Sequence, residues 1–187
     1  MAIRHEDLNP GDKVSIDQYM SGLPGRLPHT KGKEKPKDQY TGGTLFYDHA
    51  SAFIFLRHQV SLGASETLTA KKRFKQIAAA SGHTAKSYRA DNVPFGSKEF
   101  LQHIYDSPQT IDFSGTCAHH QNGVSERAIQ TVTQMARAML LHATLMWPDA
   151  GDPQLWPFAL EHAVYIWNNL PRKDSKLSPT EIFTGTK

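Results

Sequence analysis

A chain of 187 residues fits one domain, and at this size roughly 70% of the surface of the unfolded chain can be buried. Its 39% hydrophobic and 21% charged residues are typical of a globular protein, and no apolar run of about 18 residues predicts a membrane span. The net charge of +3 permits a nucleic-acid partner without identifying one. Cys117 is the only cysteine, which excludes an internal disulfide and a zinc site with two or more cysteines.

The first part of the chain predicts three strands and an insertion. Val14 to Met20 predicts a strand whose alternation is broken by Asp17. Residues 21–43 hold Gly, Pro and several Lys, which favours an exposed basic insertion, either a solvated loop or a surface for DNA phosphates or for a localisation signal. Thr44 to Asp48 and Ala52 to Val60 predict a hairpin, and the second of these has the near-continuous apolar run of a strand buried on both faces.

Alternating helices and strands follow this hairpin. Ser65 is a candidate N-cap for a helix over Glu66 to Ala80. The remaining elements are predicted as a strand over Ala85 to Asp91, a short helix over Ser97 to Tyr105, a strand over Thr110 to Ser114, a long helix over Val124 to His142 and a last helix over Leu155 to Asn169. This order predicts an α/β architecture in which helices cover both faces of a mixed sheet.

The long helix is predicted to have one packed face and one polar face. The packed stripe recurs at helical spacing and consists of Ile129, Val132, Ala136, Leu140 and Ala143. The polar stripe lies opposite and consists of Asn122, Glu126, Gln130, Thr133 and Arg137. In the last helix, the side chains of Trp156, Ala159, Ala163, Ile166 and Trp167 share a side and are expected in the core.

Three acids stand out because each belongs to a separate element. Asp17 and Asp91 each follow a strand-like run, and Glu126 lies in the first turns of the long helix, after a polar loop. Clustered carboxylates repel one another, and a bound divalent ion reverses that effect. Mg²⁺ prefers carboxylate and water ligands, and two such ions can bind the attacking and leaving oxygens of a phosphodiester. The arrangement therefore indicates metal-dependent chemistry on nucleic acid.

The strings around these acids resemble a known family. The pattern Asp17 … Asp91-Asn92 … His120-Gln121-Asn122-Gly123-Val124-Ser125-Glu126-Arg127 is similar to the catalytic core of retroelement integrases, most of all the copia-type (pseudovirus-like) retrotransposon branch. The resemblance extends from about Gly11 to Gly185, with later landmarks at Ala136-Arg137-Ala138-Met139-Leu140-Leu141, Leu155-Trp156, Asn168-Asn169-Leu170-Pro171 and Ser178-Pro179-Thr180-Glu181-Ile182-Phe183.

Two places depart from the family pattern. Val93 stands after Asn92 where the family often has Gly, and His119-His120 precede Gln121 where copia elements commonly have Pro-Gln. Neighbouring side chains diverge on a strand or a helix, which disfavours a metal site made of the two histidines. Asp48 is a further conspicuous acid, and a turn-forming role is the favoured interpretation for it.

The resemblance implies a ribonuclease H-like fold with a mixed five-stranded sheet. It implies that Asp17, Asp91 and Glu126 are the catalytic acids and hold two Mg²⁺ or Mn²⁺ ions, with Asp17 bridging both. It also implies DNA contacts, for which the candidates are Asn92, Gln121, Asn122, Gly123, Arg127, Gln130 and Arg137. The implied partners are retroelement DNA ends, target DNA and further copies of the chain, with no membrane.

The expected domain organisation is a lead-in over residues 1–10 and an integrase core over residues 11–187. Related integrases carry a zinc module before the core, and its absence suggests an isolated core, a fragment of a polyprotein or a decayed copy. The expected activity is processing of element DNA ends and joining to target DNA, in the nucleus or virus-like particle of a eukaryotic host. Two alternatives stay open: a catalytically inactive nucleic-acid-binding or assembly module from a decayed or domesticated element, and a ribonuclease H-type nuclease.

Overall fold

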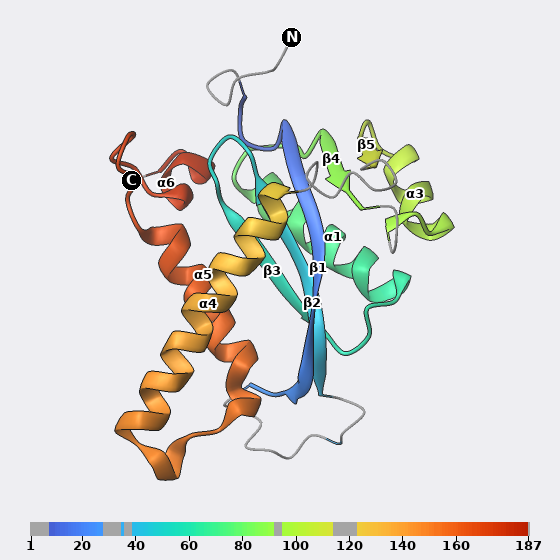
Figure 1. Cartoon of the computed structure of the whole chain (residues 1–187). Helices are drawn as coiled ribbons and strands as arrows, with labels where there is room; N and C mark the ends of the chain where they lie inside the picture. The colour runs from blue at the N-terminus through green and yellow to red at the C-terminus, as the bar shows by residue number, and fades with distance from the viewer. Residues whose placement is uncertain (1–7, 28–34, 36–38, 92–94, 114–122, 187) are drawn as a thin grey trace.

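A five-stranded mixed sheet forms the centre of the molecule (Figure 1). The structure is a computed structural model and describes residues 8–27, 35, 39–91, 95–113 and 123–186. The strands are β1 (Lys13–Gly25), β2 (Tyr40–Asp48), β3 (Ile54–Gln59), β4 (Ser87–Ala90) and β5 (Thr110–Phe113). Their order across the sheet is β3-β2-β1-β4-β5, with β1, β2 and β3 antiparallel and β4 and β5 parallel to β1. The predicted mixed five-stranded sheet is confirmed.

Helices cover both faces of this sheet. The helices are α1 (Ala64–Ala80), α3 (Lys98–Tyr105), α4 (Gly123–Met146), α5 (Trp156–Asn169) and α6 (Pro179–Thr184), and the 3-10 turns η5 (Pro148–Ala150) and η6 (Pro153–Leu155) join α4 to α5. Helices α1 and α3 lie on one side, and α4 and α5 lie on the other (Figure 1). Among the described residues, no helix is long and apolar enough to cross a membrane.

Strand alternation divides the interior into two cores. Ile16 and its partner Phe46 point toward α1 and α3 and belong to the first core. Tyr19 and Leu45 belong to the second core, beneath α4 and α5. Because side chains alternate along a strand, Asp17 shares its face with Tyr19 and is paired with Leu45. Asp17 therefore faces the α4 side of the sheet.

The first hairpin is longer than predicted. Strand β1 continues to Gly25 and β2 begins at Tyr40, so residues 21–25 and 40–43 are strand where an exposed insertion was expected. Trp156 Nε1 donates to the Leu23 carbonyl at 2.8 Å, and an ion pair of 2.6 Å joins Arg26 to Asp152. These contacts hold the end of the hairpin against the start of α5.

Helix α1 begins earlier than predicted, with Gly63 at its N-cap position. Ser65 lies in the first turn, so its predicted role as N-cap is wrong. The carboxylate of Glu66 instead accepts hydrogen bonds from the backbone N–H groups of Val60 and Ser61, both at 3.0 Å.

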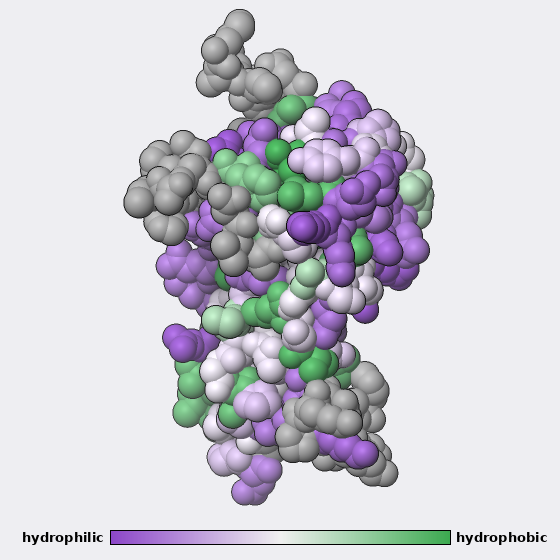
Figure 2. Space-filling view, turned by 90° about the vertical axis from the view of Figure 1, so that its right-hand side faces the viewer, coloured by the Kyte–Doolittle hydropathy of each residue, from purple (hydrophilic) through white to green (hydrophobic). Residues whose placement is uncertain are grey.

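Figure 2 shows the face on which α3 and β5 lie, and hydrophilic side chains predominate over its upper part.

Helix α4 packs with its face turned slightly from the predicted stripe. Its buried residues are Ser125, Ala128, Val132 and Ala136. The predicted members Ile129, Leu140 and Ala143 are only half-buried, because the small side chains of Ser125 and Ala128 allow the closest approach to the sheet. The predicted polar stripe is confirmed for Glu126, Gln130, Thr133 and Arg137, which are all exposed.

Candidate active site

Asp17 and Asp91 lie on neighbouring strands at equivalent positions. Ser15 of β1 is paired with Arg89 of β4, and each acid stands two residues further along its own chain. Since side chains two residues apart share a face, both carboxylates belong to the α4 side of the sheet. Strand β4 ends at Ala90, so Asp91 is the first residue beyond it.

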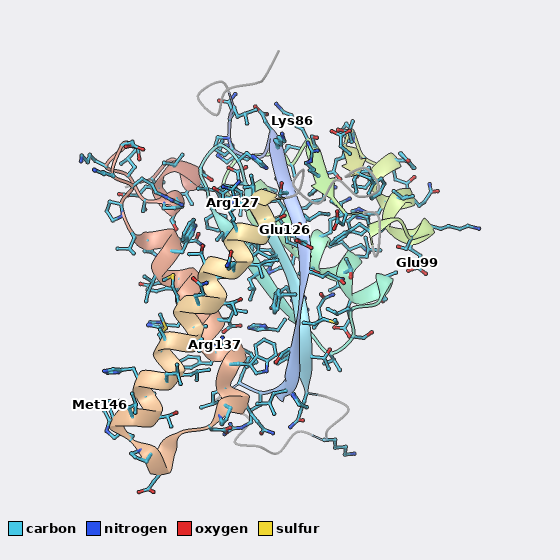
Figure 3. The ribbon with its side chains drawn as sticks, viewed as in Figure 1. Lys86, Glu99, Glu126, Arg127, Arg137 and Met146 are labelled. Atoms are coloured by element: carbon cyan, nitrogen blue, oxygen red, sulfur yellow. The ribbon has the colours of Figure 1, made fainter. Side chains whose placement is uncertain are left out.

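Glu126 reaches the same region from the first turn of α4. Figure 3 shows Glu126 and Arg127 near the end of α4 that crosses β1, with Arg137 further along the helix. The negative charge of Glu126 also favours this position, because the N-terminal end of a helix carries partial positive charge.

The electrostatics of Asp17 place the three acids within range of one another. The pKa of Asp17 is raised to about 6, mainly by burial and also by the charges of Asp91 and Glu126, against the opposing effect of a hydrogen bond from the Gln18 backbone N–H at 2.8 Å. A carboxylate that is costly to ionise beside two others is a site that gains from a bound cation.

The three carboxylates are neighbours without forming a closed cluster. Within the part of the chain that the structure describes, no three His, Cys, Asp or Glu side chains are grouped closely enough to hold a metal ion. The donor set nevertheless fits Mg²⁺ or Mn²⁺, because all three groups supply oxygen.

A groove of about 850 Å³ begins at Glu126 and follows the exposed face of α4. Gln130, Thr133 and Arg137 form its polar wall, and the opposite wall is the end of β1 from Met20 to Gly22. Its lining on α4 continues from Glu126 to Thr144, so the groove leads away from the acids.

The structure brings some of the predicted DNA-binding residues to this groove and not others. Gln130 and Arg137 line it. Arg127 is exposed outside its lining, and its Nε donates to the carbonyl of Gly123, the first residue of α4, at 2.9 Å. Asn92, Gln121 and Asn122 lie outside the described residues, as do Cys117, His119 and His120.

Asp48 has the turn-forming role that its position suggested. Its side chain is buried and accepts hydrogen bonds from the backbone N–H groups of Gly11 and Ser51 and from the Ser51 hydroxyl, at 2.6 to 2.8 Å. The carboxylate thus fixes the turn between β2 and β3.

Two polar groups on the α4 side of the molecule were not anticipated from the sequence. Ser15 Oγ lies 2.8 Å from His49 Nε2, and both residues are buried. Arg172, in the turn after α5, stacks on Trp167 with 4.3 Å between its Cζ and the ring centroid. Strand alternation could have placed Ser15 on the face of Asp17, whereas no local pattern marks Arg172.

The fold is the ribonuclease H-like fold of integrase cores, as the strand order and the structural likenesses show. No protein-family model matches the sequence. The HTLV-2 integrase catalytic core domain in complex with magnesium is similar in its trimeric form, with a TM-score of 0.63 and 18% identity over 94% of this chain and 98% of that one. Its dimeric form gives a TM-score of 0.62 and 18% identity over the same shares.

A chain of the simian T-cell lymphotropic virus intasome, solved with a PP2A regulatory subunit, has a TM-score of 0.67 and 16% identity. That match covers 94% of this chain and 55% of the intasome chain, so this chain spans about half of it. At these identities the likenesses establish the fold alone.

Proposed function

We propose that the chain is the catalytic core of a metal-dependent polynucleotidyl transferase that processes retroelement DNA ends and joins them to target DNA. The observation that carries the proposal is the convergence of Asp17, Asp91 and Glu126 on one face of an integrase-type sheet, where the other two charges raise the pKa of Asp17. The groove that continues from Glu126 along α4 supports an extended substrate.

The resemblance of the motif supplies the finer assignment. The chain is a copia-type core, derived from a retrotransposon polyprotein and acting in the nucleus or virus-like particle of a eukaryotic host. It acts as a homo-multimer on DNA, in keeping with the dimeric and trimeric forms and the intasome of the similar proteins. The magnesium of the HTLV-2 core supports Mg²⁺, or Mn²⁺, as the cofactor.

Asp17, Asp91 and Glu126 would hold the metal ions in this proposal, with Asp17 as the shared ligand and Asp91 and Glu126 completing the site. When bound, the ions would stabilise the charge on the attacking and leaving oxygens. In end processing, water would attack a phosphorus atom and the P–O bond to the 3′-oxygen would break; in joining, a DNA 3′-hydroxyl would attack a target phosphodiester and the target 3′-oxygen would leave. No protein side chain would form a covalent bond with the DNA. Gln130 and Arg137 orient the backbone along the groove.

A strand-joining reversal assay on a branched DNA tests the proposal, because it requires the acids without a complete multimer. Activity is expected with Mn²⁺ or Mg²⁺ and is expected to vanish in EDTA. Glu126→Gln is expected to lower the rate on the order of 10³-fold, or about 4 kcal/mol in the barrier, through the loss of one metal ligand.

Glu99→Gln provides a matched control. Glu99 is an exposed glutamate in the first turn of α3, on the far side of the sheet from Glu126 (Figure 3). This variant should keep wild-type activity. Equal activity of Glu126→Gln and wild type would remove Glu126 from the site. A folded, DNA-binding chain without metal-dependent activity would favour the non-catalytic assembly module, and cleavage confined to an RNA–DNA hybrid would favour a ribonuclease H-type nuclease.

A further inference from the structure

The guanidinium group of Arg172 has one edge that lacks hydrogen-bond acceptors. Nε and Nη2 are both buried, and neither has a partner among the residues that the structure describes. These two nitrogens form a single edge of the planar group, and that edge can donate two parallel hydrogen bonds to one phosphate or carboxylate. A buried donor without an acceptor is unfavourable, so this edge gains from an anion that draws it outward.

The backbone of Arg172 is fixed while its side chain is not anchored by hydrogen bonds. Its N–H donates to the Leu177 carbonyl at 2.8 Å, and its carbonyl accepts from the Lys176 N–H at 2.9 Å. The guanidinium stacks on Trp167, whose indole Nε1 donates to the Ala52 carbonyl in the turn after β2 at 2.9 Å. The turn after α5 is therefore held beside the sheet.

A second positive charge acts on the same strand as that of Arg172. Burial raises the pKa of Tyr47 on β2, and the charges of Arg172 and Arg127 both partly offset that rise. The carboxylate of Asp48, which acts in the opposite sense, is already engaged by Gly11 and Ser51. The field of both arginines at Tyr47 therefore favours a bound anion.

The position of Tyr47 relates this anion site to the candidate active site. Tyr47 is paired with Ser15 of β1, and Ser15 stands two residues before Asp17 on the same face. Two residues along a strand span about 7 Å. Tyr47 therefore lies on the strand beside Asp17, displaced from it away from the part of β1 that lines the groove.

We propose that Arg172 and Arg127 together bind a phosphate of the nucleic-acid backbone beside the reacting one, with Arg172 donating from its Nε–Nη2 edge. The inference rests on the proposed function in taking nucleic acid as the substrate. It adds an anchoring point from the turn after α5, so the substrate backbone is held on both sides of the acids.

Salt-dependent DNA binding tests this contact without any catalytic step. A short fluorescent duplex is titrated in EDTA at several KCl concentrations, and the logarithm of the binding constant is plotted against that of the salt concentration. Each lost phosphate contact lowers the magnitude of the slope by about 0.9. Arg172→Gln is expected to lower it by about one contact, whereas Arg172→Lys keeps the slope and weakens binding, because a lysine cannot donate from a planar edge.

Lys173→Gln is the matched control, since Lys173 is the exposed neighbour and the change in net charge is the same. It is expected to keep the wild-type slope, and an equal decrease in both variants would overturn the proposal. Thermal unfolding separates a structural role from a binding role. Arg172→Gln should retain the melting temperature of the free protein, whereas a lowered melting temperature with an unchanged slope would make Arg172 a packing residue.

Inorganic phosphate provides an independent measurement. Compared with chloride at equal ionic strength, it should raise the melting temperature of wild type and not that of Arg172→Gln. Protection by phosphate with no change in the DNA slope would assign the site to another anion, such as an acidic peptide, and would overturn the nucleic-acid contact.

The two proposals fail separately. If the wild-type protein joins DNA but Arg172→Gln leaves the salt slope unchanged, only the proposed phosphate contact is disproved. If the wild-type protein does not join DNA but Arg172→Gln lowers the salt slope, only the proposed transferase function is disproved.

Discussion

Tyr19 and His58 form a buried hydrogen bond between β1 and β3, with 2.8 Å between the Tyr19 hydroxyl oxygen and His58 Nδ1. The other ring nitrogen, Nε2, lies 2.9 Å from the Pro157 carbonyl of α5 and donates to it. Because burial lowers the pKa of His58 to about 4, the ring is neutral near pH 7, and Nδ1 then accepts from the Tyr19 hydroxyl.

This linkage predicts acid sensitivity. Burial lowers the pKa of His58 from 6.5 to about 4, so protonation favours the unfolded chain. The stabilisation by neutral His58 is complete above pH 6.5 and decreases by about 1.4 kcal/mol per pH unit until pH 4, a total of about 3 kcal/mol. Urea unfolding of wild type and of His58→Gln between pH 7.5 and pH 4 measures the difference, which should shrink toward acid. A constant difference would contradict the burial of a neutral ring.

A second prediction concerns Asp17 and the divalent ion. The pKa of Asp17 is raised from 3.8 to about 6, so protonation of this side chain favours the folded state. This contribution to the free energy of unfolding is complete below pH 3.8 and is lost as the pH rises through 6. Asp17→Asn should therefore raise the free energy of unfolding in EDTA at pH 7.5, by up to about 3 kcal/mol. Calorimetry should show that Mg²⁺ raises the melting temperature of wild type and not that of the variant. A less stable variant in EDTA would show that ionised Asp17 is satisfied without metal.

Helix α4 gives a test of its packed face. Val132 is 1% exposed and Thr133, the next residue, is exposed. Val132→Asp buries an unpaired charge and should cost at least about 4 kcal/mol or prevent folding, whereas Thr133→Asp should stay within about 0.5 kcal/mol of wild type. Ile129→Asp, at a position that the sequence places in the packed stripe, should cost less than Val132→Asp because Ile129 is half-buried beside the groove. Circular dichroism during thermal unfolding ranks the three, and an equal cost at positions 132 and 133 would mean that the packed face lies elsewhere.

The first hairpin predicts a contrast between two glycines. A Cβ atom on Gly43 would collide with the Arg57 carbonyl oxygen and the Tyr19 hydroxyl, whereas one on Gly22 meets nothing within 4 Å. Gly43→Ala should cost about 1–3 kcal/mol, because it forces Tyr19 away from His58. Gly22→Ala should change the free energy of unfolding by less than about 0.5 kcal/mol. Chemical denaturation measures both. Similar midpoints for the two variants would show that the strands beside Gly43 accommodate a Cβ atom without loss of stability.

The spacing of hydrophobic residues predicted most of the helices and strands, because this pattern depends only on residues that are close in the sequence. The acid strings could also be found locally, and alternation assigns Asp17 and Asp91 to one face once the strand pairing is known. Helix α6 was not predicted, although Ser178 and Glu181 form a capping box that is visible in the sequence.

Other features depend on contacts between distant segments and carry no local signal. Lys71 is fully buried in α1, where its Nζ donates to Gln109 Oε1 at 2.9 Å, and a helical lysine is ordinarily expected at the surface. The extension of β1 depends on the bond from Trp156 to Leu23, across 133 residues. The stacking of Arg172 on Trp167 likewise brings together the turn after α5 and the helix itself.

The two cores on opposite faces of the sheet have a mechanical consequence for the acids. Asp17 and Asp91 stand on the sheet itself, whereas Glu126 belongs to a helix that rests on it through small residues such as Ser125 and Ala128. A slide of α4 across the sheet would change the separation of Glu126 from the two aspartates and leave the core beneath α1 untouched. In the proposed metal site, the affinity for a divalent ion would therefore depend on the position of α4 on the sheet, and a substitution in that interface would change this affinity without replacing an acid.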